Sequence, residues 1–140
     1  MTRSNILSFL CGAAAVLGVT MIAGPSHAQA PNHVYELRIY HANPGKLDAV
    51  NARFKDHTDE IFKKHGIKSI GYFLPEDTKL NEFVYIVDHK SKEDADKNWK
   101  AFQTDPEWIK VRDESEADGK ILAKPPERVF LTATIYSPRQ

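Results

Sequence analysis

The sequence predicts an α+β domain in which a four-stranded antiparallel sheet is covered by two helices on one face. Three patterns indicate this class. Segments near both ends of the folded region alternate in the manner of strands with two different faces. The first of them is followed by apolar residues every three to four positions, which is the period of a helix. Farther along, a short loop joins two more strand-like segments and favours an antiparallel hairpin.

Residues 1–28 have the layout of a secretory signal peptide. Arg3 supplies the basic start, a long apolar run follows, and small residues surround a predicted cleavage site after Ala28. This layout divides the chain into a signal peptide, 1–28, and a single mature domain, 29–140. We expect the mature domain to be exported to the periplasm or secreted.

A second interpretation of the apolar run from Ile6 to Ala23 stays open. About 17–25 apolar residues can span a bilayer, so an uncleaved signal would tether the protein to a membrane. If the signal is removed, Cys11 goes with it, and Cys11 is the only cysteine of the chain. The mature domain then has no disulfide and no thiol for catalysis or metal binding.

The mature domain of about 110 residues has the size of one folding unit. Its acidic and basic residues are interspersed, with one acidic residue in excess once Arg3 is removed. A mixed and nearly neutral pattern offers no basic surface for nucleic acid or anionic lipid. We therefore expect no nucleic-acid partner, and a membrane contact only if the signal is retained.

The predicted elements follow the order β-α-β-β-α-β, which is the ferredoxin-like arrangement. The strands are expected at Val34–His41, Ile67–Leu74, Phe83–His89 and Arg128–Tyr136. The helices are expected at Lys46–His65 and, with a second start at Asp105-Pro106, from Ser91 to about Glu116. The third strand is apolar enough to be central and buried on both faces. Thr58 interrupts the apolar stripe of the first helix, where its hydroxyl either bonds the carbonyl four residues earlier or points into a cavity.

The two faces of the outer strands predict how the sheet is covered. The residues expected to face the helices are Tyr35, Leu37, Ile39, Val129, Leu131, Ala133 and Ile135. The residues expected on the opposite face are Glu36, Arg38, Tyr40, Phe130, Thr132, Thr134 and Tyr136. That second surface is larger than a monomer usually exposes, and a two-fold pair is the commonest way to cover it. We therefore predict a homodimer through the open sheet face, with a barrel-like interior.

The ordered motifs of the mature chain resemble those of the NIPSNAP family. The motifs are YELRIY, PGKL, KHGI, IKSIGYF, NEFVYIVDHKS, DPEW and a terminal YSP, spread from Val34 to Pro138. The resemblance implies a ferredoxin-like fold paired as a dimeric α/β barrel. It also implies similarity in fold to the antibiotic-biosynthesis monooxygenase group of small cofactor-free enzymes. It implies no settled general chemistry, and many family members are described through interactions and trafficking.

Five residues are candidates for ligand binding. On the first strand, Arg38 would bind an anionic or carbonyl oxygen, Glu36 would orient it or take a proton, and Tyr40 would donate a hydrogen bond. The alternative is a structural Glu–Arg pair that holds strand register or the dimer contact. Trp99 and Trp108 would wall a pocket between helix and sheet, or belong to the plain core.

Neither a metal nor a cofactor is predicted. His57 and His65 lie eight residues apart on one helix, too far for a metal pair on successive turns, and no histidine spacing matches a zinc or haem signature. No Gly-rich phosphate loop and no Ser-His-Asp order stands out.

The sequence thus favours an exported dimeric module that binds a small apolar or aromatic ligand, or a protein partner. The alternative is a cofactor-independent enzyme of monooxygenase or isomerase type that uses Arg38, Glu36 and Tyr40. A closed pocket lined by Arg38 with tyrosine or tryptophan walls would favour a ligand or a substrate over a purely structural role.

Overall fold

The computed structural model describes residues 33–138. The predicted signal peptide, its cleavage site and the alternative membrane anchor lie outside the described residues. Between residues 33 and 138, no helix is both long and apolar enough to cross a membrane.

Four strands form one antiparallel sheet. They are β1 (Val34–His41), β2 (Lys68–Phe73), β3 (Glu82–His89) and β4 (Glu127–Leu131). Their order across the sheet is β2-β3-β1-β4, and each neighbouring pair is antiparallel. This order confirms the predicted ferredoxin-like fold class, with β1 and β3 in the centre.

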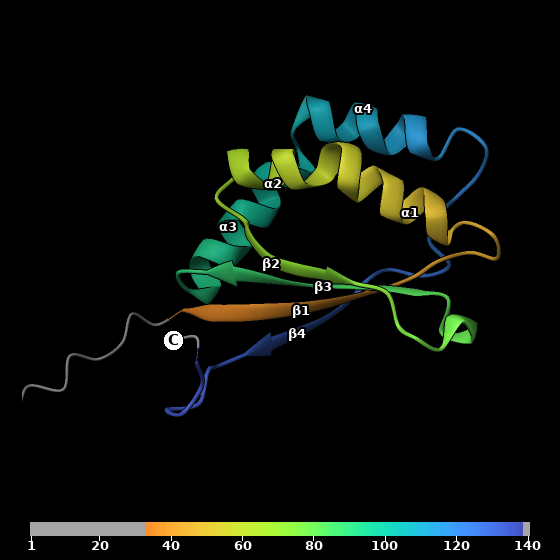
Figure 1. Ribbon diagram of the computed structural model, residues 1–140. Coiled ribbons are helices and arrows are strands. Elements are labelled where there is room, and N and C mark those ends of the chain that lie inside the picture. Colours follow the sequence, from red (N-terminus) through yellow and green to blue (C-terminus); the bar gives the residue numbers. More distant parts are fainter. Residues whose placement is uncertain (1–32, 139–140) are drawn as a thin grey trace, which may run out of the picture.

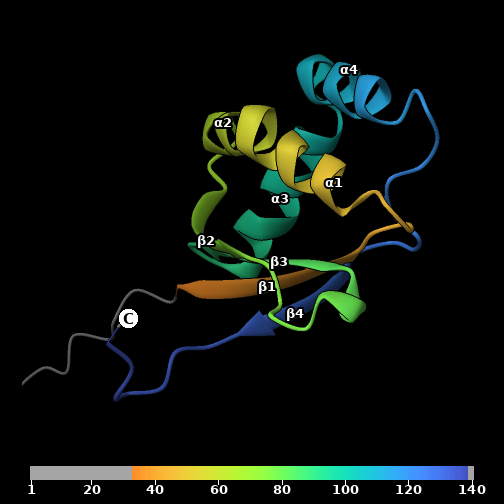
Figure 2. The same ribbon diagram turned by 45° about the vertical axis from the view of Figure 1, so that its right-hand side comes forward.

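The longer helices all lie on one side of the sheet, and no helix covers its other side, the bare face (Figures 1 and 2). They are α1 (Leu47–Arg53), a π-helical turn (Phe54–Thr58), α2 (Asp59–Lys64), α3 (Lys92–Gln103) and α4 (Pro106–Ser115). The first three are continuous and confirm the predicted helix at Lys46–His65. The caps at Ser91 and Asp105 are also confirmed, since each side chain accepts a backbone N–H of its helix. Of these helices, α4 lies farthest from the sheet.

Thr58 behaves differently from both predicted alternatives. Its hydroxyl donates to the carbonyl of Arg53, five residues earlier, at 3.0 Å. In the same turn the backbone N–H of Asp59 reaches the carbonyl of Phe54, which is the spacing of a π-helix. The wider turn places Arg53 and Phe54 next to each other on the buried side of the helix.

The predicted assignment of the sheet faces is wrong. Glu36 and Tyr40 point into the helical layer and are buried, whereas Leu37 and Ile39 lie on the bare face and are only half-buried. Period-two alternation identifies two faces without saying which one meets the helices. The inward choice depends on the partners that Glu36 finds among distant elements, and those partners are not visible in a local pattern.

The last strand is shorter than predicted. It ends at Leu131, opposite Tyr35 of β1, whereas the prediction extended it to Tyr136. Its neighbour within residues 33–138 is β1, which begins at Val34 and so offers at most one pairing position beyond Tyr35. The apolar residues that alternate after Leu131 therefore do not form part of the strand.

The core between sheet and helices is mostly aromatic, and Phe54 is at its centre. The ring of Phe54 has its centroid 4.7 Å from that of Phe83, 5.0 Å from Tyr85 and 5.4 Å from Tyr40. Phe62 of α2 lies 5.9 Å away in an edge-on contact. These contacts join the first helical stretch to both central strands, so Phe54 positions the helical layer over the sheet.

We expect Phe54→Ala to lower the free energy of unfolding by about 3–5 kcal/mol, because it leaves a cavity in a packed aromatic core. Leu80→Ala is the control, since Leu80 is 51% exposed and the expected change is below about 0.5 kcal/mol. Urea unfolding of both variants measures the difference. Equal losses in the two variants would contradict the central position of Phe54.

Candidate functional site

A fully buried carboxylate, that of Glu36, lies behind the candidate site. Its Oε1 accepts a hydrogen bond from Nη1 of Arg38 at 3.0 Å and lies 2.9 Å from Nε of Arg128. Its Oε2 accepts from the indole N–H of Trp99 at 2.8 Å. His89 lies 3.2 Å from Oε2, although its ring is not aligned for a hydrogen bond. The carboxylate thus joins β1, β3, β4 and α3.

These neighbours decide the charge of Glu36. Burial alone raises the pKa of a carboxyl group, but His89, Trp99 and the two guanidinium groups outweigh burial and hold the pKa of Glu36 below its ordinary value. The ionised form is therefore favoured in the folded protein. This contribution to stability is present near neutral pH and is lost as the pH falls through the lowered pKa.

A pocket of about 360 Å³ opens in front of this carboxylate, between the sheet and the helices. Arg38 and Tyr40 of β1 form its floor, and Trp99 and Trp108 of α3 and α4 line its walls. The segment between α4 and β4, residues 116–126, contributes the remaining side. Its volume is at the lower end of the range for small-molecule sites.

The aromatic wall is continuous from one helix to the next. The ring of Phe102 lies 5.8 Å from Trp99 and 4.5 Å from Trp108, centroid to centroid. Two arginines pack on this wall: Cζ of Arg38 is 4.7 Å from the Trp99 ring, and Cζ of Arg53 is 5.1 Å from the Trp108 ring. Both distances are within the range of cation–π attraction, so each guanidinium is held by an indole.

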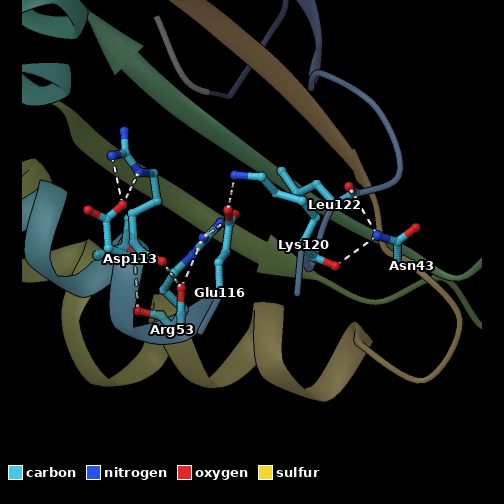
Figure 3. A network of polar contacts seen from close by, with 9 residues as sticks. Asn43, Arg53, Asp113, Glu116, Lys120 and Leu122 are labelled. Carbon is cyan, nitrogen blue, oxygen red and sulfur yellow. Dashed lines mark hydrogen bonds and ion pairs between the residues drawn. The ribbon is translucent and has the colours of Figure 1, made fainter. Parts of the chain in front are cut away.

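Arg53 is the second arginine that lines the pocket, and its side chain is only 2% exposed. Its Nη1 donates to Oγ of Ser115 at 3.2 Å and to Oε1 of Glu116 at 3.5 Å. The other oxygen of Glu116 accepts from Lys120 at 2.6 Å, so that carboxylate is shared between two cations. Figure 3 shows these contacts side by side, with Arg53 below Glu116.

The 116–126 segment is tied to the start of the domain. The side-chain amide of Asn43 donates to the backbone carbonyls of Lys120 at 2.8 Å and Leu122 at 3.3 Å, as Figure 3 shows. Between these two residues, Ile121 is fully buried and its carbonyl accepts from the backbone N–H of Asn43. The wall of the pocket is thus anchored, although the segment has no regular secondary structure.

Tyr40 is placed to donate a hydrogen bond into the pocket. Its hydroxyl oxygen accepts from the hydroxyl of Tyr85 at 3.1 Å. A tyrosine hydroxyl has one proton of its own, and that proton stays available when the oxygen acts as acceptor. Glu36 is less suited to accept a proton, because its donors favour the ionised, fully engaged carboxylate.

The five predicted site residues come together, but not in the predicted way. Glu36, Arg38 and Tyr40 were expected on the sheet face away from the helices, whereas they meet Trp99 and Trp108 on the helix-covered face. Glu36 itself stands behind the pocket, bonded to Arg38 and Trp99.

Sequence reasoning missed three polar residues around the site, Arg53, His89 and Arg128. His89 continues the inward alternation of Tyr85 and Val87 on β3, a signal that was present in the sequence. Arg128 stands opposite Arg38 in the β1–β4 register, which no local pattern predicts. Arg53 lies beside the apolar stripe of its helix and becomes buried through the π-helical turn.

Four histidines lie next to carboxylates, and His41 lies next to two of them, 3.1 Å from Glu82 and 2.9 Å from Glu127. His33 lies 2.6 Å from Asp88, and His65 lies 2.6 Å from Asp105. Within residues 33–138, no three His, Cys, Asp or Glu side chains gather in the way a metal ion would require.

Solved structures resemble the described domain closely in fold. A NIPSNAP family protein of unknown function from Agrobacterium tumefaciens is 26% identical with a TM-score of 0.66, and the match covers 78% of this chain and 95% of that one. A NIPSNAP-like domain protein from Burkholderia xenovorans is 21% identical with a TM-score of 0.67, covering 77% of this chain and 90% of that one.

A more distant likeness extends to a proposed antibiotic biosynthesis monooxygenase from Nitrosomonas europaea. It is 16% identical with a TM-score of 0.52, covers 74% of this chain and 99% of that one, and shows the shared fold alone. No curated protein matches the chain. The model of the NIPSNAP family matches residues 35–138, which is nearly the whole predicted mature domain, and the chain therefore belongs to the NIPSNAP family.

Proposed function

We propose that the protein is an exported, dimeric binding module that holds a small planar aromatic molecule between its sheet and its helices. The observation that carries this proposal is the pocket itself, in which Trp99 and Trp108 share one wall with Phe102. Planar rings stack on or edge against such a wall, and the polar groups of Arg38 and Tyr40 supply orientation.

Binding is favoured over the alternative of a cofactor-independent enzyme by the state of Glu36. An enzyme of that type on this site would need a proton acceptor near the ligand. Glu36 lies behind Arg38 and Trp99 and has both oxygens occupied. Glu36 instead holds Arg38 and Trp99 in place through its hydrogen bonds with them. A protein partner, the other candidate, is less favoured, because the aromatic side chains line a pocket of about 360 Å³ and not a flat surface.

We expect 2-naphthamide, a neutral planar probe, to shift the indole N–H resonances of both Trp99 and Trp108 in two-dimensional NMR spectra. The chain contains only these two tryptophans, so the two signals report on the pocket alone. Trp108→Leu should weaken binding about tenfold, since an aromatic contact contributes about 0.5–1.5 kcal/mol beyond the area it buries.

Phe130→Leu is the matched control, because Phe130 is an aromatic residue on the same sheet face outside the pocket. It should leave the affinity unchanged. Indole signals that stay in place up to saturating probe would rule out the proposed pocket.

The dimer is proposed from the bare face of the sheet. Its apolar residues are Tyr35, Leu37, Ile39, Phe73, Val84, Ile86, Val129 and Leu131. Leu37 is central, with Ile86 of β3 on one side and Val129 of β4 on the other. A contiguous apolar sheet face of this kind marks a surface that another molecule covers, and a second copy is the simplest partner.

We expect the wild-type protein to sediment as a dimer at micromolar concentration and Leu37→Lys to sediment as a folded monomer. A lysine at the centre of a buried apolar contact would be left without a partner charge, which opposes association. Ile109→Lys is the control, because Ile109 is an exposed apolar residue of α4 on the opposite side. A wild-type monomer, or equal effects of the two substitutions, would count against the open face as the interface.

Export is proposed from residues 1–28, as predicted above. Expression in a bacterial host with a Sec pathway should yield a periplasmic or secreted protein whose first residue, by N-terminal sequencing, is Gln29. Ala28→Arg should block cleavage, because small residues are required at the cleavage site. Full-length wild-type chain recovered from membranes would support the anchored alternative instead.

A further inference from the structure

Arg38 and Arg53 of the pocket differ in how well their charge is neutralised. Arg38 donates directly to the Glu36 carboxylate at 3.0 Å, and despite its burial its pKa lies above the ordinary value. Arg53 has only Glu116, at the outer hydrogen-bond limit of 3.5 Å, and Glu116 is also bound to Lys120. Burial lowers the pKa of Arg53, and its neighbours do not restore it.

Arg53 also has hydrogen-bonding capacity left over. Its Nε is buried and has no acceptor, as is also true of Nε of Arg38, so what sets Arg53 apart is its weaker contact with a carboxylate. A buried donor without a partner costs about 1–3 kcal/mol, and a ligand oxygen that accepts from it would recover that cost. Arg112, the third arginine of the pocket, is bonded to Asp113 at 2.7 Å and is partly exposed. Arg53 is therefore the one guanidinium of the pocket that is both buried and short of an anion.

We propose that the pocket selects aromatic carboxylic acids, whose carboxylate binds Arg53 while the ring lies against the aromatic wall beside Trp108. This inference rests on the proposed function and names its ligand class. Cζ of Arg53 lies 5.1 Å from the Trp108 ring, so an anion at Arg53 is directly next to a ring-stacking surface. A planar guanidinium matches the two oxygens of a carboxylate.

A monoanion fits better than a phosphate. A phosphate dianion would need a second free cation in the pocket, and Arg38 is already engaged by Glu36. The single negative charge of a carboxylate balances the guanidinium of Arg53. The second negative charge of a phosphate would have no partner in this partly buried site.

The test compares 2-naphthoate with 2-naphthamide, two planar probes of nearly equal size that differ in charge. Affinities come from titration of the purified protein, followed through the tryptophan indole resonances. We expect the wild type to bind the acid at least tenfold more tightly than the amide. Arg53→Met should abolish this preference, because it removes the cation and keeps an apolar side chain of similar length. Arg53→Lys should keep part of the preference.

Two further variants separate the anion effect from a general disturbance. Lys110→Met is the control for loss of a cation on α4 outside the pocket, because Lys110 is exposed and lies next to Glu114, and it should keep the preference. Glu116→Gln removes the carboxylate that competes for Arg53, so it should tighten binding of 2-naphthoate several-fold and leave 2-naphthamide unchanged. This gain of affinity does not depend on whether Arg53→Met folds.

The outcomes distinguish this inference from the proposed function. If both probes bind the wild type equally, the selection of acids is wrong and the aromatic pocket stands. If neither probe binds, the proposed function fails and the inference with it. A preference that survives in Arg53→Met, or weaker binding of 2-naphthoate to Glu116→Gln, overturns the role of Arg53.

Discussion

The buried carboxylate of Glu36 is the constraint on which the arrangement of the site depends. A carboxylate removed from water is costly unless each oxygen is engaged, and here both oxygens are engaged by groups from several elements. The contact with Arg128 connects Glu36 to the edge strand β4, and the hydrogen bond from Trp99 connects it to helix α3. The same contacts orient the Trp99 indole and the Arg38 guanidinium, which then face the pocket in fixed positions. The contacts that stabilise the buried charge of Glu36 therefore also fix the positions of Arg38 and Trp99 in the pocket.

Strand β1 serves two surfaces through alternate residues. Glu36, Arg38 and Tyr40 face the helical layer and the pocket, while Tyr35 and Leu37 belong to the bare face. One strand therefore carries both the candidate binding site and the candidate interface, separated only by the thickness of the sheet. The two properties are structurally independent at the level of side chains, since a substitution on one face leaves the residues of the other in place.

The fold could be predicted from the sequence because its signals are periodic and local. Alternation marked the strands, Ser91 and Asp105 marked helix starts, and the short loop before β3 marked a hairpin. The orientation of β1 could not be predicted, since an alternating strand reads the same from either face. Glu36 faces inward because polar groups from β3, β4 and α3 meet it there, and such partners become visible only in three dimensions.

Only part of the candidate site could be predicted from the sequence, for the same reason. Its five predicted members have chemistry that draws attention in a sequence, whereas Arg53 resembles an ordinary surface cation of an amphipathic helix. Its burial follows from the π-helical turn Phe54–Thr58, a detail of backbone hydrogen bonding that hydrophobic periodicity does not record. A π-helical turn contains one residue more than a regular turn. Loss of a single residue there would restore a regular α-helix and rotate the preceding turns by about 100° relative to those that follow. Arg53 would then leave the pocket without any change to the sheet, so the chemistry of this site is sensitive to insertions and deletions at one short stretch of the chain.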